Sequence, residues 1–104
     1  EHRNVNFILG HAGARDVADA IPFARRHPNV SLGIHGQGIG QLDELIDQLG
    51  AERLLFGSDW PFYHVAATLA KVLIVTEGRP EARRSILAGN ARRLLSGVRK
   101  RAGL

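Results

Sequence analysis

The chain has 104 residues, a length that predicts one domain or part of one. Its hydrophobic content of 44% and charged content of 23% are those of a globular protein and argue against disorder. No apolar run reaches the length of a membrane span and no secretory leader is recognisable, so we expect a cytoplasmic protein without a membrane partner. The absence of cysteine excludes disulfides, thiolate metal sites and a cysteine nucleophile.

The net charge of +4 comes mainly from basic residues in the last quarter of the chain. They fall on helical patterns, which is typical of a solvated outer helix. No aromatic side chain is interleaved with them, so nucleic-acid bases would find no stacking platform. We expect no nucleic-acid partner, and a basic nucleic-acid-binding module stays as the alternative from a different class. The residues are Arg83, Arg84, Arg92, Arg93, Arg99, Lys100 and Arg101.

The first quarter of the chain predicts a strand followed by a helix. Residues 5–9 are rich in strand formers, and His11 follows directly after the glycine that ends them. Residues 16–26 carry apolar side chains at helical spacing, with Asp16 or Asp19 as the N-cap.

The next segment repeats this order. Residues 30–34 form a second expected strand, which ends on His35 with a glycine-rich loop, residues 36–40, behind it. Residues 41–49 are an amphipathic helix, and Gly50 stands where a left-handed C-cap is expected.

A third strand is expected over residues 54–56, and a glycine and a serine end it just before Asp59. Pro61 pushes the preceding residue toward extended geometry, so Asp59 stands at a sharp exit where its side chain can face a cavity. Residues 64–76 read as a further helix. The remaining helix signals are Gly78 as a stop, Pro80 as a start, Gly89 as a stop and Asn90 as the cap of a last helix.

The order β-α-β-α-β-α-α predicts an α/β fold of parallel strands, either a doubly wound sheet or part of a (β/α) barrel. In both architectures the residues just past the strands collect at the end of the sheet where ligands bind. Here those residues are His11, His35 and Asp59. Imidazoles and a carboxylate at one rim suit a divalent metal site or an acid-base pair.

Two other interpretations were weighed. Asp59 could be a helix N-cap or an ordinary loop aspartate. The loop with Gly36, Gly38 and Gly40 could bind a nucleotide, with Asp59 as the distal acid, but its spacing is G-x-G-x-G and the third glycine comes one residue early. We therefore favour the metal or acid-base site.

Four segments together carry a resemblance to a known family. They are Asn6 to Gly13, His27 to Val30, Gly50 to Phe62 and Ile86 to Leu95. In this order and spacing they resemble the C-terminal part of the amidohydrolase-related (amidohydrolase 2) family. The most specific element runs from Phe56 to Pro61.

The resemblance implies a TIM-like (β/α)8 barrel of the metal-dependent hydrolase superfamily, with residues 1–104 as a partial domain that holds about strands six to eight. Members hydrolyse amide, ester or lactone bonds, and relatives decarboxylate aromatic acids, typically with one divalent metal ion, zinc most often. By this similarity His11 matches the strand-six histidine that holds the metal or activates its water. Asp59 matches the strand-eight aspartate that binds the metal and handles the proton of the water.

Three further side chains are candidates for the substrate pocket. His35 matches no role in the family and is expected to contact the substrate at best, with a packed histidine as the alternative. Trp60 and His64 lie in the loop over the same rim and could line the pocket, although His64 also suits the first turn of a helix.

The departure from the family is large, because its first-strand His-x-His pair and its fifth-strand histidine are not in this chain. The chain also has no methionine, even at position 1, so we expect a piece of a longer protein. We expect a fragment of a metal-dependent hydrolase acting on a small molecule, inactive alone, with a decarboxylase or lactonase of the same family as the runner-up. Open sheet edges predict that the isolated chain associates, and homo-oligomers are possible.

Overall fold

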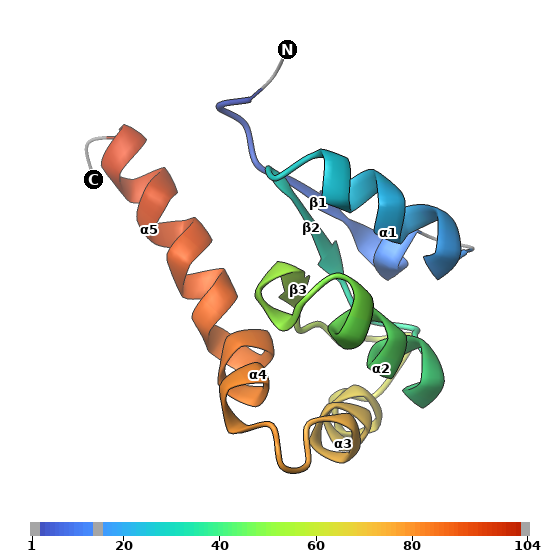
Figure 1. The fold of residues 1–104 in the computed structure, drawn as a ribbon. Coiled ribbons are helices and arrows are strands. Elements are labelled where there is room, and N and C mark those ends of the chain that lie inside the picture. The colour runs from blue at the N-terminus through green and yellow to red at the C-terminus, as the bar shows by residue number, and fades with distance from the viewer. Residues whose placement is uncertain (1–2, 14–15, 103–104) are drawn as a thin grey trace.

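A computed structural model describes residues 3–13 and 16–102 of the chain. Short strands alternate with helices as far as residue 55, and helices follow one another in the rest of the described part (Figure 1). The strands are β1 (Phe7–Leu9), β2 (Val30–Gly33) and β3 (Leu54–Leu55). The α-helices are α1 (Val17–Arg26), α2 (Ile39–Gln48), α3 (Val65–Val75), α4 (Pro80–Arg84) and α5 (Asn90–Ala102). Single turns of other helix types complete the chain: η1 (Gly10–Gly13), η2 (Ala51–Arg53) and η3 (Ser85–Gly89).

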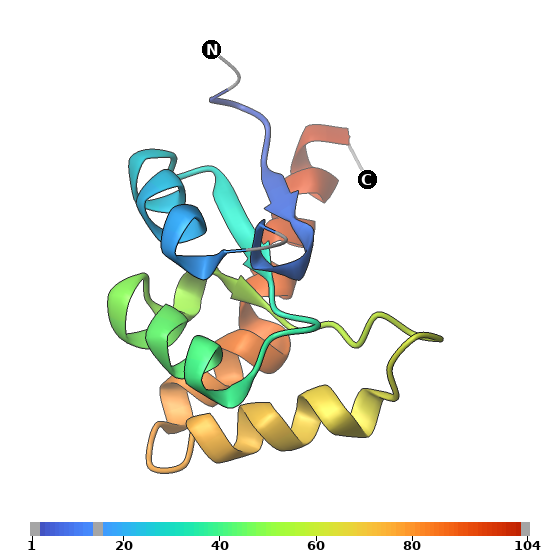
Figure 2. The ribbon, with the colours of Figure 1, turned by 90° about the vertical axis from the view of Figure 1, so that its right-hand side faces the viewer.

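The strands form one parallel sheet in the order β1-β2-β3. The crossover helices α1 and α2 lie together on one side of this sheet (Figures 1 and 2). A doubly wound sheet reverses its strand order and carries helices on both faces, whereas a barrel is wound in one direction. The predicted parallel α/β fold is confirmed, and the winding is consistent with a piece of a TIM-type barrel.

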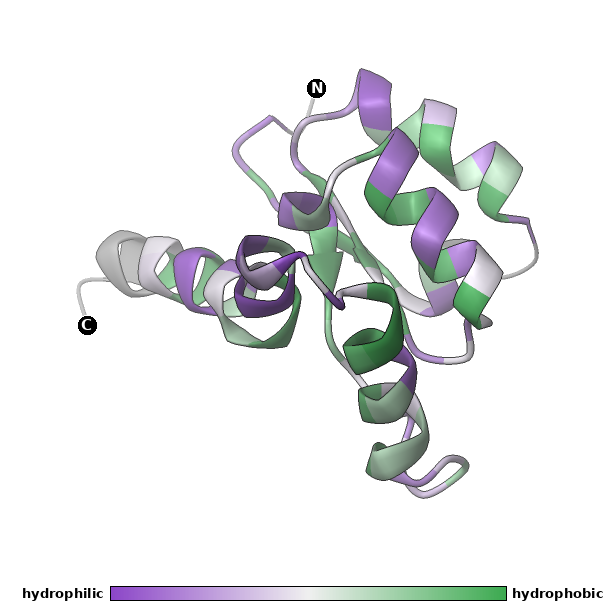
Figure 3. Cartoon of the chain, turned by 60° about the horizontal axis from the view of Figure 1, so that its bottom comes forward, coloured by the Kyte–Doolittle hydropathy of each residue, from purple (hydrophilic) through white to green (hydrophobic). Residues whose placement is uncertain are grey.

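The core lies between the sheet and the two crossover helices. All of β2 is buried, and Leu32, Leu42, Leu45 and Leu54 are almost completely inaccessible to solvent. Helix α3 is hydrophobic nearly all round (Figure 3), a pattern typical of a helix with neighbours on more than one side. Several apolar residues of β1 and α3 are nevertheless exposed, among them Phe7, Ile8, Val65, Leu73 and Ile74.

Helix ends follow local chemistry. The carboxylate of Asp16 accepts a hydrogen bond from the Ala18 N–H at 2.9 Å, so Asp16 rather than Asp19 is the N-cap of α1. Helix α2 starts two residues before the predicted position, at Ile39, because the Gln41 side chain accepts from the N–H of the preceding Gly38.

The prediction that Gly89 ends a helix and Asn90 caps the next one was wrong. The chain stays helical through this point, because the π-helical turn η3 joins α4 to α5. The Asn90 amide donates instead to the carbonyl oxygens of Ala51 and Leu54, each at 2.7 Å. The Asn90 side chain therefore ties the helix to the segment that leads into β3, while the backbone of Asn90 continues the helix.

Arg53 forms hydrogen bonds at the amino ends of the strands, which is the end of the sheet opposite the predicted site. Its guanidinium donates to the carbonyl oxygens of Ala24, His27 and Val30. Burial lowers the pKa of Arg53, and the neighbouring Glu52 carboxylate raises it in part. An arginine remains charged under any ordinary condition, so these are charge-assisted hydrogen bonds.

Among the described residues, none of the helices is both long and apolar enough to cross a membrane.

The Arg53→Met variant should lose about 2–4 kcal/mol in its free energy of unfolding, because three carbonyl groups lose a charged donor. Thermal unfolding followed by far-UV circular dichroism checks this. The Arg92→Met variant, changed at an exposed position on α5, is the control and should melt like the unaltered protein. Equal midpoints for the two variants would contradict the role given to Arg53.

Candidate metal centre

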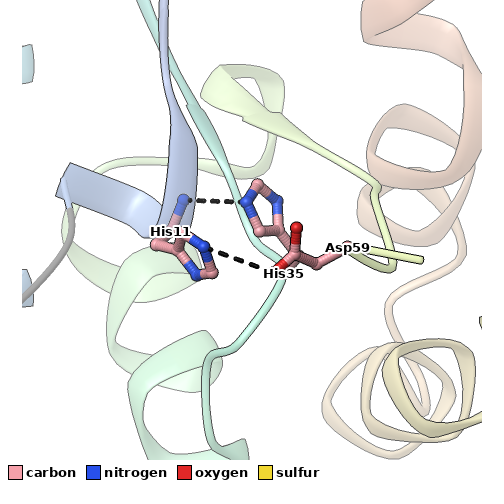
Figure 4. A group of neighbouring side chains, drawn as sticks. All are labelled: His11, His35 and Asp59. Atoms are coloured by element: carbon pink, nitrogen blue, oxygen red, sulfur yellow. Dashed lines mark hydrogen bonds and ion pairs between the residues drawn. The ribbon is translucent and has the colours of Figure 1, made fainter. Parts of the chain in front are cut away.

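The strand register brings the predicted site residues to one edge of the sheet. Leu9 pairs with Leu32, and Leu32 with Leu54, so the strands are level at these residues. His11 lies two residues beyond this level, and the other two site residues follow a little further along their own loops. The three side chains therefore converge at the carboxyl ends of the strands (Figure 4).

His11, His35 and Asp59 form a compact cluster. One possible ligand atom from each lies within 4.8 Å of the others. His11 Nε2 is 3.4 Å from Asp59 Oδ2, and the two side chains are 45% and 30% exposed, so solvent reaches them. The imidazole rings of His11 and His35 meet edge to face, with centroids 4.2 Å apart.

This donor set fits a divalent cation of the zinc type. Imidazole nitrogen and carboxylate oxygen are preferred zinc ligands, with bonds of about 2.0–2.2 Å. Two ligands of a tetrahedral ion are then about 3.3–3.5 Å apart, and the 3.4 Å between His11 Nε2 and Asp59 Oδ2 matches that spacing.

The backbone of the cluster is strained. His11 (φ 51°, ψ 33°), Ala12 (φ 49°, ψ 40°) and Asp59 (φ 64°) all have positive φ. Side-chain-bearing residues rarely adopt this region, and each one costs about 1–3 kcal/mol. Such strain gathers at ligand sites, because it points side chains where an unstrained loop would not.

Glycines make room for the imidazole rings. A Cβ atom at Gly33, Gly57 or Gly10 would lie 3.2–3.6 Å from the His35 ring, so the ring fills a space bounded by the ends of all three strands. A Cβ atom at Gly36 would lie only 2.8 Å from Nδ1 of His11. The glycine-rich loop, the alternative nucleotide site, therefore packs against His11 of the cluster.

Trp60 and His64 lie outside this cluster. Nδ1 of His64 accepts from the Ala66 N–H at 3.1 Å, which makes His64 the N-cap of α3. Trp60 is 70% exposed and meets His64 edge to face, with centroids 6.1 Å apart. In the described part of the chain, no hydrogen bond or ring contact joins either residue to the cluster, and their place in a substrate pocket stays a prediction.

Sequence reasoning missed Gln37. Its side chain is buried, with 6% of the residue exposed, and its Nε2 donates to the His11 carbonyl oxygen at 2.8 Å. The available signal was its position in the loop after the second strand, at the same edge as His11. A glutamine between glycines carries no pattern that separates this role from a solvent-facing one.

Comparison with known proteins identifies the family of this chain. The amidohydrolase family profile matches residues 1–97. The chain belongs to the amidohydrolase family. Among curated proteins no match to this chain was found.

Solved structures similar to this chain include two of 2,6-dihydroxybenzoate decarboxylase. The one from Rhizobium is 26% identical, and the one complexed with 2,6-dihydroxybenzoate is 25% identical; both have a TM-score of 0.71 over 92% of this chain. A zinc-bound amidohydrolase from Burkholderia multivorans, 24% identical, shares the fold with a TM-score of 0.69 over 88% of this chain. The chain spans only 36% of the decarboxylases and 44% of the Burkholderia protein.

The contact between Gly36 and His11 can be tested against a matched glycine. Gly36 and Gly78 have similar positive φ values, 80° and 74°, but a Cβ atom at Gly78 would meet no atom within 4 Å. Both alanine variants lose about 1–2 kcal/mol to backbone strain, and Gly36→Ala loses a further amount of about 1–3 kcal/mol by crowding His11. Thermal unfolding should rank Gly36→Ala clearly below Gly78→Ala, and equal midpoints would argue against the contact.

Proposed function

We propose that this chain is the carboxyl-terminal part of a metal-dependent hydrolase of the amidohydrolase type, with one divalent cation, zinc first, held by His11 and Asp59. The observation that carries the proposal is the 3.4 Å separation of His11 Nε2 and Asp59 Oδ2 at the carboxyl ends of the two outer strands of the parallel sheet, β1 and β3. Family membership supports the same chemistry.

In this proposal the chain supplies strands six to eight of a (β/α)8 barrel. This chain spans only 36% and 44% of the similar structures, and β1 and β3 each pair with only one strand of the described sheet. The exposed apolar residues of β1 and α3 are the surfaces that further barrel units would cover. The remaining ligands then come from strands upstream of Glu1, so the isolated chain should lack turnover.

A divalent cation, when bound, supplies an electrophile and a water molecule of lowered pKa. Asp59 would hold the cation through a carboxylate oxygen, and its carboxylate would be the group that takes up the proton of that water and passes it to the leaving group. His11 contributes an Nε2 atom directed at the same point, so the two side chains fix the reacting position. The open rim admits a small-molecule substrate.

A decarboxylase is the second candidate, and a specific observation favours it. Two of the similar structures, each with a TM-score of 0.71, are those of 2,6-dihydroxybenzoate decarboxylase. Loss of carbon dioxide leaves an electron pair on a ring carbon, and a proton must replace the carboxylate there. His11 and Asp59 are the groups of the cluster that can deliver this proton.

A nucleic-acid-binding module has little support from the contacts of the basic residues. Arg83 donates to the Leu73 carbonyl and to Thr76 Oγ1, and Arg93 donates to the Glu52 carbonyl. These guanidinium groups stabilise the packing of the helices. A nucleic-acid-binding function would require strongly salt-dependent binding to DNA or RNA.

The metal proposal is tested on the protein in its full natural length. It should hold about one divalent ion per chain, and Asp59→Asn should weaken that binding at least about tenfold, since even partners outside the ligand set are worth 10–100-fold. Elemental analysis after dialysis against chelators measures this. Asp16→Asn is the matched control, because asparagine caps a helix as well as aspartate does. Metal binding that survives Asp59→Asn unchanged would exclude Asp59 as a ligand.

Product analysis decides between the two reactions. The full-length protein is supplied with dihydroxybenzoates and, separately, with a panel of amides, esters and lactones. Release of carbon dioxide from the former assigns a lyase, and release of a new carboxylate from the latter assigns a hydrolase. We expect the Asp59→Asn variant to lose either activity, because both place Asp59 at the reacting atoms.

A further inference from the structure

Two side chains of the loop after β2 form hydrogen bonds with the backbone N–H and the carbonyl oxygen of His11. Nε2 of His35 accepts a hydrogen bond from the His11 N–H at 3.2 Å (Figure 4). Gln37, from the same loop, donates its Nε2–H to the His11 carbonyl oxygen at 2.8 Å. A residue with φ 51° persists only where its surroundings over-determine the conformation, and these two side chains provide that restraint.

The donor and acceptor roles define the tautomer of His35. A backbone N–H can only donate, so Nε2 of His35 must be the unprotonated nitrogen and Nδ1 carries the proton. A metal ion needs a free imidazole lone pair, and the lone pair of His35 is already used by His11. Nδ1 also faces the glycine backbones, since a Cβ atom at Gly57 or Gly33 would lie 3.4 Å from it.

We propose that His35 and Gln37 are positioning residues that hold His11 in the conformation needed to bind the cation, and that His35 is not itself a ligand. This inference rests on the proposed metal site of His11 and Asp59. It accounts for the glycines around His35, since a Cβ atom at Gly10, Gly33 or Gly57 would lie 3.2–3.6 Å from its ring. It also accounts for a buried glutamine at a functional edge of the sheet.

The restraint extends to the helix behind the Asp59 loop. Lys71 of α3 donates from Nζ to the carbonyl oxygen of Gln37 at 3.1 Å. A hydrogen bond thus connects the loop that contacts His11 to α3, the helix that follows Asp59 in the chain. The two metal-binding side chains are set relative to each other before any ion arrives, which lowers the cost of assembling the site.

Two substitutions at one position separate positioning from ligation. The amide oxygen of His35→Gln can take the place of Nε2 and accept from the His11 N–H, but an amide is a poor zinc ligand. His35→Leu removes both abilities. In full-length protein titrated with zinc against a chelator, we expect His35→Leu to weaken binding about 10- to 100-fold and His35→Gln to stay within about threefold of the unaltered protein. The His27→Gln variant, at an exposed histidine, is the control.

Gln37 offers a second, independent substitution. Gln37→Met keeps the length of the side chain and removes its donor, so zinc binding should weaken about tenfold. Gln48→Met removes an exposed glutamine whose side chain donates to Glu44, and this variant should bind zinc like the unaltered protein.

A measurement without metal keeps this inference separate from the proposed function. In the metal-free protein with ¹⁵N-labelled histidine, the His11 amide proton should exchange slowly with solvent, remain slow in His35→Gln and exchange faster in His35→Leu. If the unaltered protein binds no metal, the proposed function fails, while this exchange pattern still decides whether His35 restrains His11.

The opposite results are equally clear. If His35→Gln and His35→Leu lose zinc binding equally, and X-ray absorption of the zinc-loaded protein counts one imidazole fewer in both, His35 is a ligand and the positioning role is overturned. An unchanged zinc affinity and an unchanged His11 amide in His35→Leu overturn it as well.

Discussion

The parallel register of three short strands is the constraint on which the rest of this structure depends. Because Leu9, Leu32 and Leu54 lie side by side, the loops that follow the strands all start from one level. The side chains of His11 and Asp59 meet only because of this alignment. A shift of one residue in any strand would turn its side chains to the other face and separate the imidazole from the carboxylate.

The two ends of the sheet are built differently. At the amino ends of the strands, Arg53 and Asn90 satisfy buried carbonyl groups, and the backbone there is held by neutral and charge-assisted hydrogen bonds. At the carboxyl ends, His11 and Asp59 are strained and partly exposed. Barrels of this class place stability at the first end and function at the second. The hydrogen bonds of Gln37 and Arg53 therefore serve different purposes. Gln37 restrains the conformation of His11, and Arg53 stabilises the fold.

The elements of the fold were predictable wherever neighbouring residues decide the outcome. Asp16 caps its helix through an N–H two residues away, and apolar spacing located α1 and α2 within two residues of their observed starts. The prediction failed at Gly89 and Asn90. There the deciding partners were Ala51 and Leu54, which lie 39 and 36 residues away in sequence and become neighbours only in the folded chain.

By itself the sequence determined the alternation of strands and helices, the family, and the fact that His11, His35 and Asp59 each follow a strand. These features are local, because residues adjacent in sequence determine where strands end and helices are capped. Only the tertiary structure decided that Nε2 of His35 accepts a hydrogen bond from the His11 N–H and that Gln37 donates one to the His11 carbonyl oxygen. The reason is that hydrogen bonds across 24 and 26 residues depend on register and on left-handed loop conformations, which no spacing of residue types encodes.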